Sequence, residues 1–247
     1  AGTDSFSKHG ISDVSASRIG GIAVVIYVVI HLLYQWKISG VSPSFYVTSM
    51  TCAGVAFFFT GLAEDLRGNL SAEFRMIVLL FLALVILLIA PSLRAPSSGF
   101  ERLDIFVTYY PATGILLTGI ALAFFCSAFN SADGANGLVS SLTFFALFGM
   151  MSVGASSIVS IAAPVLTACL VFLVLNLLAG RFFLGDGGDY FLAVITGFCA
   201  LGVLDFEPRM LPFALALVLY PILDLSCAMA VRAYSQSSVF SADNRHL

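Results

Sequence analysis

Long apolar runs separated by short polar stretches dominate this chain. A membrane-spanning helix needs about 20 apolar residues, and eight runs approach that length. They are Ile19–Trp36, Tyr46–Leu62, Met76–Ala90, Tyr109–Phe129, Leu138–Val153, Ile158–Leu178, Tyr190–Leu204 and Met210–Val231. Their continuity favours helices over strands, because lipid offers no partners for backbone polar groups. The pattern predicts an all-α, polytopic membrane protein with about eight transmembrane helices.

The composition supports this prediction. The 247 residues are 60% hydrophobic and only 10% charged, with a mean hydropathy of +1.02, whereas soluble domains are about 45–50% apolar and about 25% charged. A net charge of −3 without a basic patch argues against a nucleic-acid partner. The chain lacks an initiator Met and an N-terminal signal-peptide core, so we expect it to begin inside a longer protein. The five cysteines lie in apolar runs and are expected to be buried.

The connecting segments sort onto two faces when the spans alternate in direction. One face receives the N-terminal segment, 63–75, 130–137, 179–189 and the C-terminal tail. The other receives 37–45, 91–108, 154–157 and 205–209. The first face holds seven basic residues against four, so the positive-inside rule places it in the cytoplasm. Ten of the fourteen acidic residues also lie on or beside that face, and carboxylates at a membrane edge are candidates for function.

The first candidate motif is the pair Glu64 and Asp65, which follows the second apolar run. Adjacent carboxylates at a helix C-terminus meet the unfavourable end of the helix dipole and also repel each other. A bound cation would relieve both costs, although a solvated helix end explains the pair equally well when it is considered alone.

The second motif connects two spans and reads Asn-Ser-Ala-Asp-Gly-Ala-Asn-Gly-Leu over residues 130–138. Its Asp-Gly and Asn-Gly steps are turn formers, because glycine and asparagine tolerate positive φ. The side chains of Asn130, Ser131, Asp133 and Asn136 could bind a metal, a phosphate or a base. An ordinary turn explains the glycines equally well, but it does not explain Asn130 at the end of the helix.

The third motif reads Phe-Leu-Gly-Asp-Gly-Gly-Asp over residues 183–189. Its glycines would let the backbone approach a pyrophosphate, and the following helix would offer free N–H groups to an anion. Asp186 is a hard oxygen ligand that suits Mg²⁺. Upstream, the amide of Asn176 could contact a base and the guanidinium of Arg181 a phosphate. A flexible glycine-rich turn is the alternative.

Further polar groups lie in the last span and at the two ends of the chain. Asp224 would cost about 2.5–3.5 kcal/mol at the centre of a membrane, unless it lines a polar cavity or pairs with Arg232 or another motif. The N-terminal segment adds Lys8, His9 and Arg18, and the C-terminal tail adds Arg245 and His246.

In order and spacing, these motifs resemble the polyprenyl-phosphate N-acetylhexosamine-1-phosphate transferases, a glycosyltransferase family 4 type. That family includes transferases that initiate O-antigen and teichoic-acid synthesis, and phospho-MurNAc-pentapeptide translocase. Glu64 and Asp65 stand at its Asp-Asp pair, and residues 130–138 match its Asn-x-x-Asp-Gly-x-(Asp/Asn)-Gly-Leu loop. Asn176, Arg181 and residues 183–188 match its Asn…(Lys/Arg)-x-Phe-(Leu/Met)-Gly-Asp-x-Gly segment. The remaining matches are Lys8, His9, Arg18, Gly20, Gly21 and Asp224.

Three departures from the family pattern stand out. Glu64 replaces the first Asp of the pair, and Asn136 replaces an Asp found in many members. The family also has a helix before the first loop and further histidines and at least one helix after the last residues seen here. Residues 1–247 are therefore expected to be a single integral membrane transferase domain, truncated at both ends.

The resemblance implies transfer of a sugar-1-phosphate from a UDP-sugar to polyprenyl (undecaprenyl) phosphate, with release of UMP. It implies Mg²⁺, or Mn²⁺ in its place, held by Asp186, and Asp65 with Glu64 as catalytic carboxylates on the acceptor side. Asp65 would orient the acceptor phosphate or act as a base. Implied substrate-binding residues are Asn130, Asp133, Asn136, Asn176, Arg181, Lys8, Arg18, Arg245 and His246.

The resemblance also implies a place in the bacterial inner membrane with cytoplasmic active-site loops, and it is compatible with a homodimer. Two other classes stay open from the residues alone. A transporter could line an ion path with these carboxylates, but it would place polar groups deep in several spans. A structural scaffold gives no reason for three carboxylate-bearing segments on one face. The sugar is left open; the motif variants lean towards O-antigen or capsule initiation over peptidoglycan synthesis.

Overall fold

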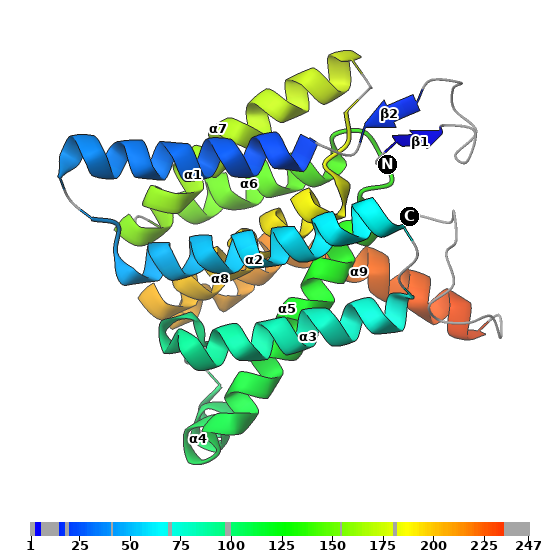
Figure 1. Cartoon of the computed structure of the whole chain (residues 1–247). Helices are drawn as coiled ribbons and strands as arrows, with labels where there is room; N and C mark the ends of the chain where they lie inside the picture. The colour runs from blue at the N-terminus through cyan, green and yellow to red at the C-terminus, as the bar shows by residue number, and fades with distance from the viewer. Residues whose placement is uncertain are drawn as a thin grey trace.

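The computed structural model describes residues 3–5, 15–17, 20–40, 42–68, 71–96, 100–153, 155–179 and 182–234. This described part contains nine α-helices (Figure 1). They are α1 (Gly20–Ser39), α2 (Phe45–Arg67), α3 (Ala72–Ile89), α4 (Glu101–Tyr109), α5 (Pro111–Ala132), α6 (Leu138–Met151), α7 (Ser156–Ala179), α8 (Gly185–Phe206) and α9 (Leu211–Tyr234). Two short strands, β1 (Thr3–Ser5) and β2 (Ser15–Ser17), pair antiparallel before α1. The all-α prediction is confirmed for the body of the molecule.

Each of the eight predicted spans coincides with a helix, namely α1, α2, α3 and α5 to α9. Seven of these helices are long and apolar enough to cross a membrane. The exception within the described residues is α6, an apolar helix of 14 residues. Helix α4 was not predicted, because its nine residues mix charges and aromatic side chains without a long apolar run. The chain is thus a multi-pass membrane protein.

The helices extend further than the apolar runs that predicted them. Helix α2 continues past Leu62 to Arg67, and α8 begins at Gly185, five residues before Tyr190. Backbone hydrogen bonding continues through polar side chains, whereas hydropathy falls as soon as the first charge appears. Glu64, Asp65 and Asp186 therefore lie within terminal helical turns and not in loops, which gives them defined directions.

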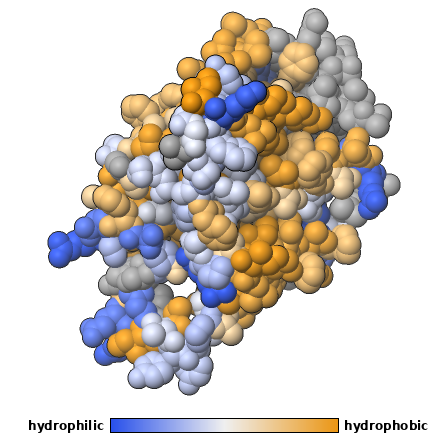
Figure 2. Space-filling model, turned by 60° about the vertical axis from the view of Figure 1, so that its left-hand side comes forward, coloured by the Kyte–Doolittle hydropathy of each residue, from blue (hydrophilic) through white to orange (hydrophobic). Residues whose placement is uncertain are grey.

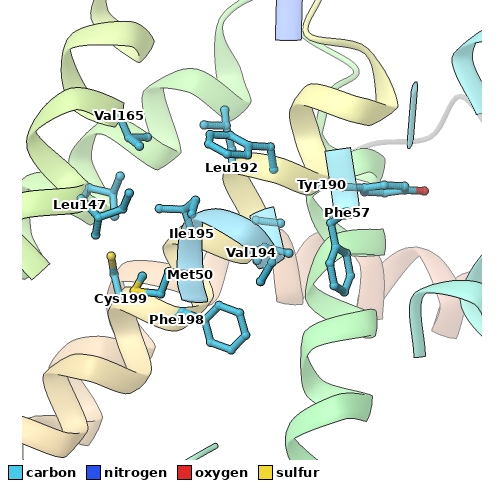
Figure 3. Packing of buried hydrophobic residues seen from close by; sticks show 14 of the residues in the cluster. Met50, Phe57, Leu147, Val165, Tyr190, Leu192, Val194, Ile195, Phe198 and Cys199 are labelled. Atoms are coloured by element: carbon cyan, nitrogen blue, oxygen red, sulfur yellow. The ribbon is translucent and has the colours of Figure 1, made fainter. Parts of the chain in front are cut away.

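Helix α8 forms the centre of the bundle. It packs against α1, α2, α5, α6, α7 and α9, and 72% of its apolar window is buried, compared with 17–44% for the other candidate spans. Figure 3 shows Ile195, Phe198 and Cys199 of α8 packed with Met50 of α2 and Leu147 of α6. Tyr190 lies at the edge of this cluster, and its hydroxyl points away from it. The central helix therefore presents its N-terminal end to the site described below.

The outer surface of the bundle is largely apolar. Large side chains such as Phe81, Ile89 and Leu178 are 68–81% exposed, and Figure 2 shows broad hydrophobic areas with hydrophilic patches at their margins. Such a surface suits contact with lipid chains. Cys52 and Cys227 are also exposed, so the expectation that every cysteine is buried was wrong for these two. Their helices turn these positions outwards, whereas Cys126, Cys169 and Cys199 are buried.

The helix ends gather on two opposite faces, as alternating spans require. Figure 1 shows the end of α2, the start of α3, the α5–α6 turn, the start of α8 and the end of α9 on the side of the strands. The α1–α2 turn and α4 lie on the opposite side. The predicted grouping of the acidic motifs on a single face is therefore confirmed for the motifs that the structure describes.

Candidate active site

Asp65 joins the end of α2 to the start of α8. Its Oδ1 accepts a hydrogen bond from the backbone N–H of Asp186 at 3.2 Å, and its Oδ2 accepts one from Gly187 at 3.1 Å. Leu184, at the N-cap position of α8, offers no capping side chain. The first turn of a helix leaves N–H groups without intrahelical partners, and a carboxylate satisfies them while also complementing the dipole. Asp65 therefore caps α8 from a different helix.

This contact changes the interpretation of the third motif. The N–H groups of Asp186 and Gly187 were expected to be free for an anion, but they donate to the protein's own carboxylate. A carboxylate and a phosphate oxygen seek the same donors, so Asp65 takes the place expected for the substrate at these two groups. The cap instead fixes the turn that carries Asp186.

Glu64 lies in a second, mostly buried cluster. Its Oε1 accepts a hydrogen bond from Nη1 of Arg75 at 2.7 Å, and its Oε2 accepts one from the Tyr190 hydroxyl at 3.4 Å. The same Arg75 Nη1 lies 3.8 Å from Oδ2 of Asp186. The side chains of Glu64 and Asp186 are 10% and 15% exposed, compared with 31% for Arg75. Two carboxylates from different helices thus face one guanidinium.

Residues 182–187, which end in the first turn of α8, are held from three sides. The backbone N–H groups of Gly20 and Gly21 in α1 donate to the carbonyls of Phe183 and Leu184 at 2.9 and 3.0 Å. From α7, the amide of Asn176 donates to the carbonyl of Phe182. Asp65 holds the segment from α2. These contacts position the start of α8 relative to α1, α2 and α7.

Asn176 therefore has a structural contact in addition to its predicted role at a base. Its side chain is only 1% exposed, and its Oδ1 has no hydrogen-bond partner among the described residues. An amide oxygen that is buried without a partner costs free energy. Substrate binding by Asn176 stays a prediction.

The glycines near Asp186 allow helices to approach closely. A Cβ added to Gly61 would collide with the backbone of Asp186, and a Cβ on Gly188 would lie 2.8 Å from the Cα of Gly21. Glycines were expected here to admit a pyrophosphate, and the structure shows that they admit the neighbouring helices α1 and α2. Gly185 has a φ of 71°, a left-handed conformation that favours glycine.

Replacing Gly188 with alanine is expected to destabilise the bundle by about 1–3 kcal/mol, because the new methyl group would overpack the contact with Gly21. Gly197→Ala is the matched control on the same helix, since its Cβ would find only ordinary contacts at 3.4–3.7 Å. Thermal unfolding in detergent measures both variants. Equal stability of the two would contradict a tight contact between α1 and α8.

The second motif forms the turn that was predicted. Asp133 follows the last residue of α5, Gly137 precedes α6 with a φ of 75°, and Asn136 is exposed. Asn130 lies in the last turn of α5 and is partly buried. The turn occupies the same face of the bundle as the start of α8 (Figure 1), whose first turn contains Asp186. Substrate binding by Asn130, Asp133 and Asn136 stays a prediction.

The remaining predicted residues are placed as follows. Asp224 lies in α9 and is only 2% exposed, so it does not face lipid; its predicted pairing with Arg232 or another motif stays a prediction. Five of the predicted substrate-binding residues lie outside the described residues. They are Lys8, Arg18, Arg181, Arg245 and His246.

Sequence reasoning did not select Arg75 or Tyr190 as site residues. Arg75 lies in the first turn of α3, where a cation meets the positive end of the helix dipole. That unfavourable position was a signal that Arg75 has an acidic partner. Tyr190 gave no comparable signal, because a tyrosine that begins an apolar run is common at a membrane boundary.

The oxygen donors of the cluster are compatible with Mg²⁺. Within the described part of the chain, no three His, Cys, Asp or Glu side chains gather into a metal cage. Mg²⁺ does not need one, because it usually takes one or two carboxylates together with water and substrate phosphates. Asp186 and Glu64 already share a cation in Arg75, so the position attracts positive charge.

A cavity of about 140 Å³ opens beside this cluster between α2 and α3. Thr60, Ala63, Phe74, Val78 and Leu79 form much of its wall, and Glu64, Arg67, Arg75 and Tyr190 provide its polar groups. An apolar wall with two guanidinium groups at the membrane face suits a ligand that carries both a hydrocarbon chain and an anionic head.

Comparison with known proteins gives a consistent family assignment. Residues 47–203 match the family profile described as glycosyl transferase family 4. The chain is 25% identical, over 99% of its length, to "Probable undecaprenyl-phosphate N-acetylglucosaminyl 1-phosphate transferase" of Bacillus subtilis, covering 68% of that protein. It is 26% identical over 80% of its length to "Undecaprenyl-phosphate alpha-N-acetylglucosaminyl 1-phosphate transferase" of Yersinia pestis, covering 56% of it.

A third relative is named for a different substrate. The chain is 29% identical, over 69% of its length, to "Phospho-N-acetylmuramoyl-pentapeptide-transferase" of Clostridioides difficile. It spans 56% of that protein, and so a little over half the length of two of these three relatives. The matched region includes Glu64, Asp65, Arg75 and Asp186, so the cluster lies within the part that is shared.

Proposed function

The chain belongs to glycosyl transferase family 4, and on that premise we propose that it transfers an N-acetylhexosamine-1-phosphate unit from a UDP-sugar to polyprenyl phosphate. The observation that carries this proposal is the cluster of Glu64, Arg75 and Asp186 beside an apolar cavity at the end of a membrane bundle. Relatives named for undecaprenyl-phosphate N-acetylglucosaminyl 1-phosphate transfer support the same chemistry. The family assignment gives no support to the transporter alternative.

The reaction joins an oxygen of the polyprenyl phosphate to the β-phosphorus of the UDP-sugar. The bond between that phosphorus and the bridging oxygen of UMP breaks, and UMP leaves with the electron pair. Positioning and charge neutralisation dominate such a transfer. Mg²⁺, held by Asp186, would supply the neutralising charge at the diphosphate.

The chain's own residues would bind the acceptor lipid and position the start of α8. The guanidinium of Arg75 has five N–H donors, of which Glu64 accepts from one nitrogen. The others, with Arg67 in the same cavity, are suited to the acceptor phosphate. The apolar wall between α2 and α3 would take the first carbons of the lipid, while Asp65 keeps the start of α8 in place.

The face that carries the site is proposed to be cytoplasmic. UDP-sugars are soluble, charged donors, and the excess of basic residues on this face follows the positive-inside rule. The membrane is proposed to be the bacterial inner membrane, where the relatives' undecaprenyl phosphate would serve as acceptor.

Release of UMP tests this function. Membranes that contain the protein would be supplied with UDP-N-acetylglucosamine labelled in the sugar, with and without added undecaprenyl phosphate. We expect UMP and a labelled lipid in equal amounts, both dependent on the acceptor and on Mg²⁺. Substrate flux into vesicles without UMP release would instead support a transporter, and UDP release would indicate transfer of the sugar without its phosphate.

A further inference from the structure

Arg75 is shared unequally between two carboxylates. Its Nη1 is 2.7 Å from Glu64 Oε1, a charge-assisted hydrogen bond, but 3.8 Å from Asp186 Oδ2. Glu64 is also the less exposed of the two carboxylates and accepts a second hydrogen bond from Tyr190. The guanidinium is therefore anchored on Glu64 and only approaches Asp186.

This inequality has a consequence for cation binding. A guanidinium that forks onto a carboxylate uses the oxygens that a divalent cation would need. If Glu64 were replaced by an uncharged side chain, the remaining carboxylate near Arg75 would be Asp186, at 3.8 Å. A small rotation of the arginine side chain would then pair it with Asp186.

We propose that Glu64 is a positioning residue that keeps Arg75 from pairing with Asp186 at hydrogen-bond distance and so leaves Asp186 available to a divalent cation. The inference rests on the proposed function, because it takes Asp186 as the metal ligand. It gives the two adjacent carboxylates separate roles: Asp65 caps α8, and Glu64 restrains the competing cation. The Tyr190 hydroxyl orients Glu64 for this task.

Mg²⁺ binding by the purified protein provides the test, with a readout that does not depend on activity. The midpoint of the Mg²⁺-dependent rise in Tm would be measured in detergent without UDP-sugar. Glu64→Gln keeps the size of the side chain and removes its charge. We expect its Mg²⁺ midpoint to rise by about tenfold or more. Loss of a residue that supports a metal ligand lowers metal affinity by a factor of this order at other sites.

A second substitution separates competition from simple damage. In the double variant Glu64→Gln with Arg75→Met, the competing cation is gone, so the Mg²⁺ midpoint is expected to return close to that of the unchanged protein. Arg75→Met alone is expected to bind Mg²⁺ at least as tightly as the unchanged protein. Weaker binding by Arg75→Met, or no recovery in the double variant, would overturn the proposal even if Glu64→Gln fails to fold.

Glu73→Gln is the matched control. Glu73 is exposed in the first turn of α3, the turn that also contains Arg75. The substitution Glu73→Gln removes one negative charge from the same face of the bundle, as Glu64→Gln does. Its Mg²⁺ midpoint is expected to stay unchanged, and a tenfold rise there would mean that general charge loss explains the effect. If the unchanged protein shows no Mg²⁺-dependent shift while it still transfers sugar phosphate, the metal role of Asp186 fails together with this inference, and the transferase function stands.

Discussion

Asp186→Asn is expected to lower Mg²⁺-dependent sugar-phosphate transfer by at least about 100-fold. Loss of a residue that only hydrogen-bonds a metal ligand lowers metal affinity or activity by roughly 10–100-fold. Asp186 is proposed to be a ligand itself, so its loss should cost at least as much. The fold should survive, because the cap of α8 uses the backbone N–H of Asp186 and not its side chain. Initial rates of UMP release at several Mg²⁺ concentrations, together with Tm, measure the effect.

Asp205→Asn is the control for this substitution. Asp205 is exposed at the opposite end of the same helix, so the change removes the same charge far from the site. Its rate is expected to stay close to that of the unchanged protein. Near-normal, Mg²⁺-dependent transfer by Asp186→Asn would rule out the metal role.

Asp65→Ala is expected to reduce both stability and transfer. Loss of a helix-capping side chain costs about 0.5–2 kcal/mol, and here two backbone N–H groups lose their acceptor at once. Transfer should fall by about 100-fold, because displacement of a catalytic turn by about 1 Å has a cost of that order. Tm and the rate of UMP release measure the two effects separately.

Asp65→Asn distinguishes the capping role from that of a base. Asparagine has one acceptor oxygen, so it can replace Asp65 at only one of the two backbone N–H groups. This variant should therefore keep part of the stability and part of the activity that Asp65→Ala loses. A variant with a clearly higher Tm than Asp65→Ala, but with an equally low rate, would instead support a base, or a direct charge contact with the acceptor phosphate.

The membrane fold was predictable because the physical constraint is strong. Lipid admits few solutions for a long apolar run, so the runs around Met50, Leu79 and Val194 identified their helices correctly. Helix α4 could not be predicted in the same way, since its nine residues contain charges and no long apolar run. The family resemblance was confirmed by the profile match over residues 47–203.

The site was only partly predictable, because contacts between helices depend on how the helices rotate and pack. Asp65 and Asp186 could be selected as polar residues at span ends, but their spacing did not show that one caps the other's helix. Arg75 was visible only as a basic residue near a span. Its pairing with Glu64 requires α2 and α3 to pack so that the side chain of Arg75 reaches that of Glu64.

The cap that Asp65 places on α8 also bears on how the protein is made. The two partners are separated by 121 positions in the chain, so α2 emerges from the ribosome well before its partner. The contact can form only after α8 has been synthesised and inserted between helices already in the membrane. A nascent chain that stops before Gly185 therefore contains the first carboxylate pair but no functional site, which ties the onset of activity to late membrane insertion.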